Sequence, residues 1–543
     1  MGLRATYLPH SPRVSNFMNT DRTRFGTALL AAALSALAGA CAAPGRAVTA
    51  RTPVALAPLF GDHAVLQAGR PVPVWGTAGA GDPVAVTFRG QTARAVADAG
   101  GRWTVTLAPL AASAEPSDLV AAGATTAAAH DVVVGEVWLC SGQSNMEFTV
   151  ASGGPASRVD NAAAEVAAAN FPRVRQIRVE RAVASAPAVD AKLGGWQPAS
   201  PATVAQFTAV GYFFARDVHQ ALGVPVGIIL SSWGGTPIES WMSDGARAST
   251  SVAGTLEARW RAAKSEWPPE RVARYPADMA AWQKAQADAE AAHAKNPLPW
   301  PPPPASDDSP ARPGGLYNAM IAPLQPCAMR GILWYQGESN VGRAAEYAEL
   351  LNTLIRSWRA GWGQGDLPFL FVQISSFGNR LDRTDRGWAQ LREAQAQVLG
   401  APATGMAVTV DIGNPENVHP TNKQDVGRRL ALLAEAKVYG MAVECSGPVF
   451  AGAAREGKAM RVRFTHAGAL LVARAGPVRT LEIAGRDRVF HSAAGAIDGD
   501  TLVVSSPEVD EPAAVRYAWT DAPEPNLYND AGLPAVPFRS DNW

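Results

Sequence analysis

The sequence is short of cysteine, and it carries no excess of either charge. Its 543 residues include only four cysteines, and none of them stands in a CxxC pair. So few cysteines exclude a disulfide-stapled scaffold, and their spacing gives no structural zinc site. Lys+Arg and Asp+Glu both total 48, so the chain offers no broad cationic surface to nucleic acid or to an anionic membrane.

Long apolar runs and metal-ligand clusters are missing as well. Beyond the N-terminus no stretch is long and apolar enough to span a bilayer, so we expect no transmembrane segment in the mature chain. No His, Cys and acidic residues stand at metal-ligand spacing, and we expect neither a metal nor an organic cofactor. What the chain has is a globular composition, with 47% hydrophobic and 18% charged residues, in a length that suggests two to four domains.

The first 41 residues have the pattern of an export signal. Arg22 and Arg24 precede an apolar stretch, residues 25–38, which has the length of a signal h-region and is too short to cross a bilayer. An A-x-A cleavage pattern follows at 38–40, directly before Cys41. We therefore expect an exported protein, periplasmic or secreted, and a lipid anchor on Cys41 is the alternative to a free mature chain.

Two segments alternate apolar and polar residues, as half-buried strands do. In residues 52–128 the period of two runs, for example, through Val84 and Val86. The same alternation returns in residues 447–543, for example at 462–464. We expect a small β-sandwich at the N-terminal end and a second β domain at the C-terminal end.

Between these segments, residues 129–446 show continuous apolar runs, as in strands that are buried on both faces. Helical stripes separate the runs, and this alternation predicts a parallel sheet with helices on both faces. The insertion at about 243–312 looks helical and ends in a proline run, which is a stiff spacer; we expect it to cover the mouth of the active site. The apolar runs are residues 132–134, 137–139, 226–230, 331–334, 369–372 and 407–410.

Four of the predicted strand ends carry clusters of polar residues. Catalytic groups in parallel sheets sit at the carboxyl ends of the strands, and so many hydrogen-bonding groups are costly to bury unless they serve something. The clusters are residues 140–147 (CSGQSNME), 231–241 (SSWGGTPIESW), 334–340 (WYQGESN) and 411–420 (DIGNPENVHP).

Ser144 and His419 stand in the settings that best suit catalysis. Ser144 follows a glycine-containing turn behind a buried strand, which suits an exposed nucleophile at a helix N-terminus; an ordinary helix cap is the alternative. Of the eight histidines, only His419 stands at the end of a buried strand, beside acidic residues and before a helix. Such a setting favours a general base over a structural histidine.

Taken in order, the four clusters resemble the sialate O-acetylesterase branch of the SGNH hydrolases. The resemblance rests on GQSNM, GGTxIExW, WYQGESN and DIG…HPxxK, and it spans about residues 55–540. It implies an α/β fold with a flavodoxin-like, three-layer αβα core around a parallel sheet, flanked by β-sandwich-like N- and C-terminal domains. It also implies an esterase whose partner is acetylated carbohydrate.

Carried over residue by residue, the resemblance implies that Ser144 is the nucleophile and that His419 is the general base. The oxyanion donors would be the backbone N–H groups of Ser144 and Gly235 and the side chain of Gln336, with Asn340 as the alternative to Gln336. For the tryptophans of these clusters, core packing is the alternative to sugar binding. The candidate substrate-binding residues are Gln143, Trp233, Trp241, Trp334 and Glu338.

The third triad position departs from the family pattern, which places an aspartate three residues before the histidine. Here Glu416 has that offset from His419. Asp411 is the rival, because it has the shorter side chain and stands at a strand end. A plain Ser–His dyad is the third possibility.

Three functions stay open on the sequence alone. The first is an exported serine esterase that deacetylates sugars through an acetyl-enzyme, as a sialate O-acetylesterase does. The second is the same chemistry on acetylated plant polysaccharide, such as xylan or xyloglucan. The third is a non-catalytic carbohydrate-binding surface protein, which the intact Ser144 and His419 disfavour. The sequence leaves the sugar and the oligomeric state open.

Overall fold

The structure of the chain is a computed structural model that describes residues 52–151, 158–292, 298, 301, 304–378 and 386–543. The predicted export signal, with Cys41, and most of the proline-rich spacer lie outside the described residues. No helix of the described part is long and apolar enough to cross a membrane.

A mixed sheet forms the centre of the fold. Five parallel strands stand side by side in the order β11-β8-β12-β13-β14, which is 2-1-3-4-5 by their place in the chain and is the flavodoxin-like order. Strand β9 extends the sheet parallel to β11, and β10 closes this edge antiparallel to β9. The strands are β8 (Thr126–Gly142), β9 (Phe171–Arg178), β10 (Gln197–Ala199), β11 (Val226–Ser232), β12 (Gly331–Tyr335), β13 (Phe369–Val372) and β14 (Thr404–Ala407).

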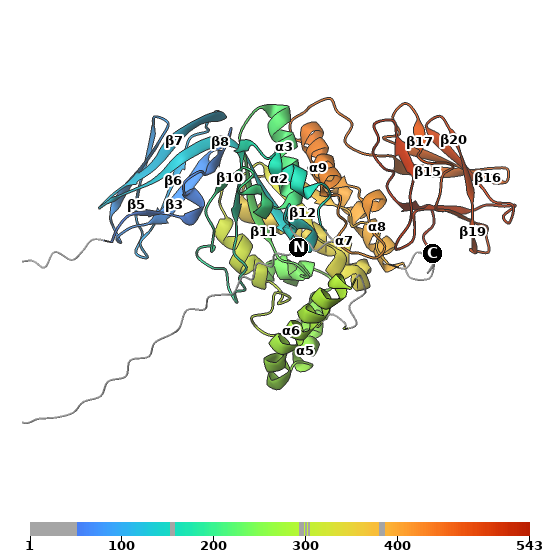
Figure 1. The fold of residues 1–543 in the computed structure, drawn as a ribbon, viewed down its shortest axis with the longest axis horizontal. Helices are drawn as coiled ribbons and strands as arrows, with labels where there is room; N and C mark the ends of the chain where they lie inside the picture. The colour runs from blue at the N-terminus through green and yellow to red at the C-terminus, as the bar shows by residue number, and fades with distance from the viewer. Residues whose placement is uncertain (1–51, 152–157, 293–297, 299–300, 302–303, 379–385) are drawn as a thin grey trace, which may run out of the picture. The chain divides into compact units, whose positions relative to one another are not determined.

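Helices cover both faces of this sheet (Figure 1). Alternate residues of β8 divide between two apolar cores, because side chains along a strand point to opposite faces. Trp138 and Cys140 pack in one core with α2 (Ala162–Ala167), α3 (Ala209–Leu222) and α9 (Lys423–Lys437). Val137 and Leu139 pack in the other core, to which α7 (Ala344–Trp362) and α8 (Gly387–Gln397) contribute.

The N-terminal strands join the central sheet through β8, whose 17 residues run across the predicted domain boundary at 128/129. Its first half pairs with β7 and β2, and its second half pairs with β11 and β12. One strand therefore connects the N-terminal β part to the turn that carries Ser144. The N-terminal strands are β1 (Ala55–Leu56), β2 (Val65–Gln67), β3 (Val72–Thr77), β4 (Pro83–Phe88), β5 (Gln91–Val96), β6 (Arg102–Leu107) and β7 (Ser113–Ala122).

In its described residues the predicted insertion contains three helices, α4 (Asp244–Ala248), α5 (Ala253–Ser265) and α6 (Pro269–Ala291). Two contacts join this segment to α7 of the core. Arg259 pairs with Glu346 at 2.7 Å, and the hydroxyl of Ser251 donates to Glu349 at 2.5 Å. The role of this segment as a cover for the active site stays a prediction.

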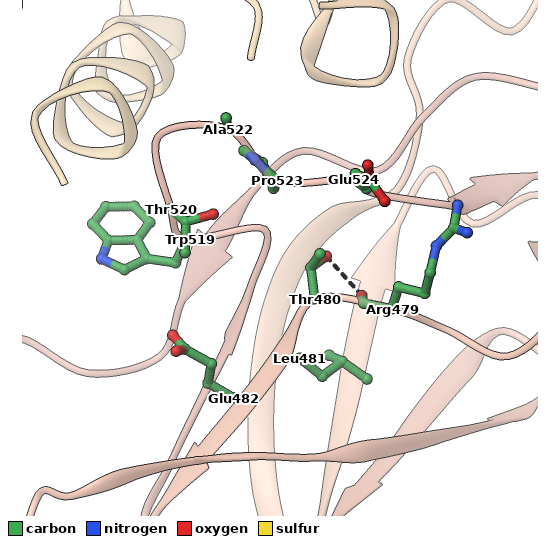
Figure 2. A pocket seen from close by; sticks show the side chains of 9 residues that line it. All are labelled: Arg479, Thr480, Leu481, Glu482, Trp519, Thr520, Ala522, Pro523 and Glu524. Carbon is green, nitrogen blue, oxygen red and sulfur yellow. Dashed lines mark hydrogen bonds between the residues drawn. The ribbon is translucent and has the colours of Figure 1, made fainter. Parts of the chain in front are cut away.

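The C-terminal strands have an apolar core of their own. They form four-stranded sheets in the orders β15-β16-β21-β20 and β19-β18-β22-β24, and a pair of β17 with β23. A cavity of about 330 Å³ lies in this part (Figure 2), and its lining comes from residues 479–482, 519–520 and 522–524, none of which is a predicted site residue. The strands are β15 (Val449–Glu456), β16 (Ala459–Thr465), β17 (Leu471–Ala473), β18 (Leu481–Ala484), β19 (Phe490–Ser492), β20 (Ala494–Asp498), β21 (Thr501–Ser505), β22 (Ala514–Tyr517), β23 (Leu527–Asn529) and β24 (Phe538–Arg539).

The fifth strand of the parallel sheet lies earlier in the chain than predicted. The apolar run 407–410 indicates a strand, whereas β14 ends at Ala407 and a short 3-10 turn follows at Val410–Ile412. Thr409 explains the end of the strand, because its hydroxyl donates to the carbonyl of Gln373 at 2.6 Å and holds the chain in the turn.

Candidate active site

The turn between β8 and the short helix α1 (Ser144–Glu147) presents Ser144 at the carboxyl end of the sheet. Gly142 ends the strand with φ of +133°, and a Cβ at this position would stand 2.1 Å from the carbonyl oxygen of Tyr335 on β12. Only glycine fits such a contact without moving backbone. The glycine therefore lets β8 turn sharply against β12 and places the serine at the start of α1.

Ser144 and His419 lie side by side although 275 residues separate them in the chain. The Oγ of Ser144 and the Nε2 of His419 are 2.9 Å apart, which is hydrogen-bond distance and the separation that a nucleophile and its general base would need. The imidazole stacks on Phe148 with ring centroids 5.6 Å apart, and the backbone N–H of His419 donates to Asn417 Oδ1 at 2.9 Å. The ring and its backbone are therefore held from two sides.

The His419 imidazole is uncharged at neutral pH. Burial, and after it the cation of Lys423, lower the pKa of His419 to about 4. Both causes disfavour the imidazolium, since burial removes water from a charged ring and a nearby cation repels it. The ring is therefore ready to accept a proton from Ser144 at any pH above about 4.

Neither candidate carboxylate lies on the imidazole. Asp411 forms a two-bond ion pair with Arg429 of α9, at 2.6 and 2.7 Å, and it also accepts from the hydroxyl of Tyr528 at 3.2 Å. The prediction that Asp411 orients His419 is therefore corrected: this carboxylate faces α9 and binds its guanidinium.

Glu416 is exposed, in a turn where its backbone N–H donates to Asn414 Oδ1 at 2.9 Å. The described residues show no hydrogen bond between its carboxylate and His419. Glu416 thus has the usual sequence offset from His419, but its carboxylate does not bond to the imidazole. The described contacts are those of a Ser–His dyad.

The glycine turn after β11 lies against the nucleophile. A Cβ on Gly234 would stand 3.2 Å from the Cβ of Ser144, and the backbone N–H of Gly234 donates to Glu147 Oε2 at 2.9 Å. The backbone N–H of Trp233 donates to the carbonyl of Gly142 at 3.1 Å. Gly235 follows with φ of +73°, exposed and with open space around its Cα. These bonds hold the turn beside Ser144, so Gly235 stays a candidate oxyanion donor.

Gln336 has both of its amide hydrogens engaged in internal bonds, whereas Asn340 has one. The buried Gln336 donates from Nε2 to Asn340 Oδ1 at 2.7 Å and to the carbonyl of Thr236 at 3.2 Å. Asn340, also buried, donates from Nδ2 to Glu239 Oε2 at 3.1 Å and accepts from the backbone of Ile238 at 3.0 Å. The two amides brace the chain at 236–239. The prediction of Gln336 as an oxyanion donor is corrected, and Asn340, which makes one donor bond among the described residues, stays a candidate.

Of the predicted sugar-binding tryptophans, only Trp233 is accessible. Trp241 and Trp334 are fully buried and pack edge to face with centroids 6.1 Å apart, so core packing, the stated alternative, describes them and the sugar-binding prediction is corrected. Trp233 is half-buried, and the exposed guanidinium of Arg181 lies over its ring, 5.5 Å from the centroid. Trp233 and Arg181 thus form an accessible surface next to the glycine turn.

Gln143 and Glu338, the polar members of the predicted substrate set, take part in internal contacts. Gln143 is buried, and its Oε1 accepts from the backbone N–H of Ser339 at 3.2 Å. Glu338 Oε1 accepts from Asn145 Nδ2 at 2.5 Å, and burial raises the pKa of Glu338. Both side chains therefore bind the β12 loop to the nucleophile turn, which corrects their prediction as sugar ligands.

Sequence reasoning assigned no role to Asn145 or Lys423, which meet directly behind the dyad. Lys423 Nζ donates to Asn145 Oδ1 at 2.6 Å, and Asn145 Nδ2 also donates to the carbonyl of Val418 at 3.1 Å. Burial lowers the pKa of Lys423 to about 7, while Glu338 opposes that shift. Asn145 directly follows Ser144, and Lys423 ends the HPxxK pattern. Their places in these motifs were the sequence feature from which a role could have been predicted.

No group of three or more His, Cys, Asp and Glu side chains that could hold a metal ion occurs in the described residues. The arrangement offers instead a serine hydroxyl paired with a neutral imidazole, beside a turn with backbone N–H groups. These are the parts that acyl transfer uses.

Comparison with known proteins places the chain in a family. A family model described as carbohydrate esterase, sialic acid-specific acetylesterase, matches residues 305–435. The sialate O-acetylesterases of Rattus norvegicus and Mus musculus are each 31% identical, over 68% of this chain and 70% of their own length. The crystal structure of a carbohydrate acetylesterase from Xanthomonas citri is 38% identical, covers 90% of this chain and 100% of its own, and superposes with a TM-score of 0.75. The chain belongs to the sialate O-acetylesterase family, and it is a carboxylic ester hydrolase.

Proposed function

We propose that this protein removes O-acetyl groups from carbohydrate through an acetyl-enzyme formed on Ser144. The observation that carries the proposal is the 2.9 Å contact between Ser144 Oγ and His419 Nε2 at the carboxyl end of the parallel sheet. A non-catalytic sugar-binding protein has no need of a nucleophile in contact with a neutral, half-buried imidazole. We also propose that the fold is of the SGNH type, with a three-layer core.

The acylation half runs between Ser144 and His419. As Ser144 Oγ attacks the acetyl carbonyl carbon, its proton passes to His419 Nε2. The carbonyl oxygen becomes an oxyanion, which the backbone N–H groups of Ser144 and Gly235 would bind. The tetrahedral intermediate then loses the sugar oxygen, which takes the proton from His419 Nε2. The sugar hydroxyl leaves, and the acetyl group stays on Ser144.

The deacylation half repeats these steps with water. A water molecule gives one proton to His419 Nε2 while its oxygen attacks the acetyl carbonyl carbon. The second tetrahedral intermediate releases acetate by breaking the bond to Ser144 Oγ, and the proton on His419 returns to that oxygen. The dyad regains its starting state, so one water is consumed for each acetyl group removed.

For the sugar itself, we propose an acetylated sialic acid, as in the name of the mammalian relatives. The parts of the site that would contact the acetyl group are backbone N–H groups and the Ser144–His419 dyad, and they determine the ester chemistry. The sugar would contact the Trp233–Arg181 surface, where an indole ring and an accessible guanidinium suit a ring that carries a carboxylate. We also propose that the segment at residues 1–41 exports the protein, because acetylated glycans lie outside the cytoplasm.

The test compares acetate release from 9-O-acetyl sialic acid and from acetylated xylo-oligosaccharides. Ser144→Ala and His419→Ala should abolish release from both, a fall of roughly 10⁴ or more in kcat. Ser265→Ala, a change of an exposed serine on α5, is the matched control and should keep full activity. Activity in Ser144→Ala above a tenth of the wild-type value would overturn the mechanism. Preference for the xylo-oligosaccharides would overturn the choice of sugar alone.

A further inference from the structure

One side-chain amide joins the segments that carry the two members of the dyad. Asn145, 1% exposed, follows Ser144 in the chain, and its Nδ2 donates to the carbonyl of Val418, the residue before His419. The same amide accepts from Lys423 Nζ and donates to Glu338 Oε1. Nucleophile turn, histidine loop, α9 and the loop after β12 therefore meet at a single side chain.

Both flanking charges are held inside the protein. Lys423 is 0% exposed, and its Nζ lies 5.5 Å from the ring centroid of Phe148 and 5.6 Å from that of Tyr335. Glu338 Oε2 is buried and has no hydrogen-bond partner among the described residues. A buried cation and a buried carboxylate are costly unless they interact with polar groups. The amide of Asn145 supplies that contact to both of them, which fixes its own orientation.

His419 needs such a fixed anchor because it lacks the usual one. In a triad, a carboxylate on Nδ1 sets the position of the imidazole. Among the described residues neither Asp411 nor Glu416 bonds to this ring. The loop that carries the histidine is instead bonded to the nucleophile turn, one residue away from each reacting group, through Asn145 and Val418.

We propose that Asn145, oriented by Lys423 and Glu338, is the positioning residue that holds His419 against Ser144 in place of a triad carboxylate. The inference rests on the proposed function of the dyad. Asn145 touches no reacting atom and acts through the Val418 carbonyl. Loss of that bond displaces the imidazole from Ser144 Oγ, and a misplacement of about 1 Å can cost on the order of 100-fold in rate.

Two variants separate the Asn145–Val418 hydrogen bond from the other bonds of Asn145. In Asn145→Asp, Oδ1 can still accept from Lys423, but the second carboxylate oxygen meets two acceptors, Glu338 Oε1 and the Val418 carbonyl. Adding Glu338→Gln restores a donor toward residue 145 and leaves one carboxyl group in the network, as in wild type. The Val418 carbonyl still has no donor in the double variant, so that bond alone stays missing.

We expect Asn145→Asp to be destabilised, and the double variant to recover its melting temperature. Its kcat for p-nitrophenyl acetate should stay about 100-fold below wild type with little change in KM. Phosphonylation of Ser144 by a fluorophosphonate should slow by a similar factor, because that reaction also needs the positioned base. Asn529→Asp is the control: Asn529 is equally buried and donates to two backbone carbonyls in the C-terminal part, so it should alter stability only.

The outcomes are distinct for each idea. A double variant with more than a third of the wild-type kcat would overturn the positioning role, and so would failure of both variants to fold, which marks a purely structural network. The proposed function fails separately, when wild type releases no acetate or when Ser144→Ala keeps its activity.

Discussion

The two carboxylates near the dyad allow a direct test of whether His419 works without a triad acid. We predict that Glu416→Gln leaves kcat/KM for acetyl-ester hydrolysis within tenfold of wild type, because the exposed side chain does not bond to the imidazole. We predict that Asp411→Asn lowers stability while the folded enzyme keeps its kcat. We therefore expect the two variants to differ in melting temperature and to hydrolyse the acetyl ester at similar rates.

The magnitudes come from the contacts of Asp411. Its side chain is 4% exposed and that of Arg429 is 9% exposed, so Asp411→Asn leaves a buried guanidinium without its counter-charge. Removal of one partner from a buried ion pair typically costs about 3–5 kcal/mol of unfolding free energy. Loss of a triad acid acts elsewhere: it costs about 10⁴ in kcat, equivalent to about 5.5 kcal/mol of transition-state stabilisation.

The assay measures kcat/KM well below the melting temperature, together with the melting curve of each variant. Asp411→Leu combined with Arg429→Met is the matched control, since an apolar pair in place of a buried ion pair is often neutral for stability. We expect the double variant to recover most of the melting temperature lost in Asp411→Asn. A fall of 10³ or more in kcat, in a folded single variant of either carboxylate, would refute the dyad.

Four further predictions follow from the same site. Because burial and Lys423 lower the pKa of His419 to about 4, kcat/KM should fall only as the pH drops through about 4, and a limb near the ordinary value of about 6.5 in the pH profile would contradict this. The folded state should also lose stability as the pH falls from about 6.5 toward 4, since the unfolded histidine binds a proton there and the folded one does not. Dialysis against a strong chelator should leave activity unchanged, and activity restored by added zinc or calcium after such dialysis would argue for a metal. Trp233→Ala should raise KM for acetylated sialic acid and leave hydrolysis of p-nitrophenyl acetate unchanged, and equal losses on both esters would remove Trp233 from the sugar site.

The fold class was open to prediction because it depends on local periodicity. Apolar runs without alternation occur where both faces of a strand are covered, and the predicted runs at 226–230, 331–334 and 369–372 fall within β11, β12 and β13. The resemblance to the sialate O-acetylesterases is confirmed, as is the mixed α/β class. Periodicity fails where one side chain ends an element, as Thr409 does after β14. It also fails where a strand such as β8 continues from the N-terminal strands into the central sheet.

The pairing of polar side chains could not be predicted in the same way. Ser144 and His419 were identifiable because each follows a predicted buried strand, and the carboxyl ends of parallel strands meet. Asp411 follows the same predicted strand as His419, yet it binds Arg429 of α9. Gln336 and Asn340 likewise bind each other. Which of several nearby acceptors a donor reaches depends on ångström-scale placement, and sequence spacing does not supply it.

The charge behind the imidazole has the opposite sign to that of a triad, and this changes what His419 can do. A carboxylate on Nδ1 raises the basicity of a histidine, whereas Lys423, with burial, lowers the pKa of His419 to about 4. Such a ring is a weaker proton acceptor, but it is unprotonated over the whole range from weakly acidic to neutral pH. Weak basicity costs driving force in each proton transfer, so close and well-aligned contact with Ser144 matters more. The buried amide contact through Asn145 supplies that alignment, and Lys423, which after burial lowers the pKa of His419, also binds that amide.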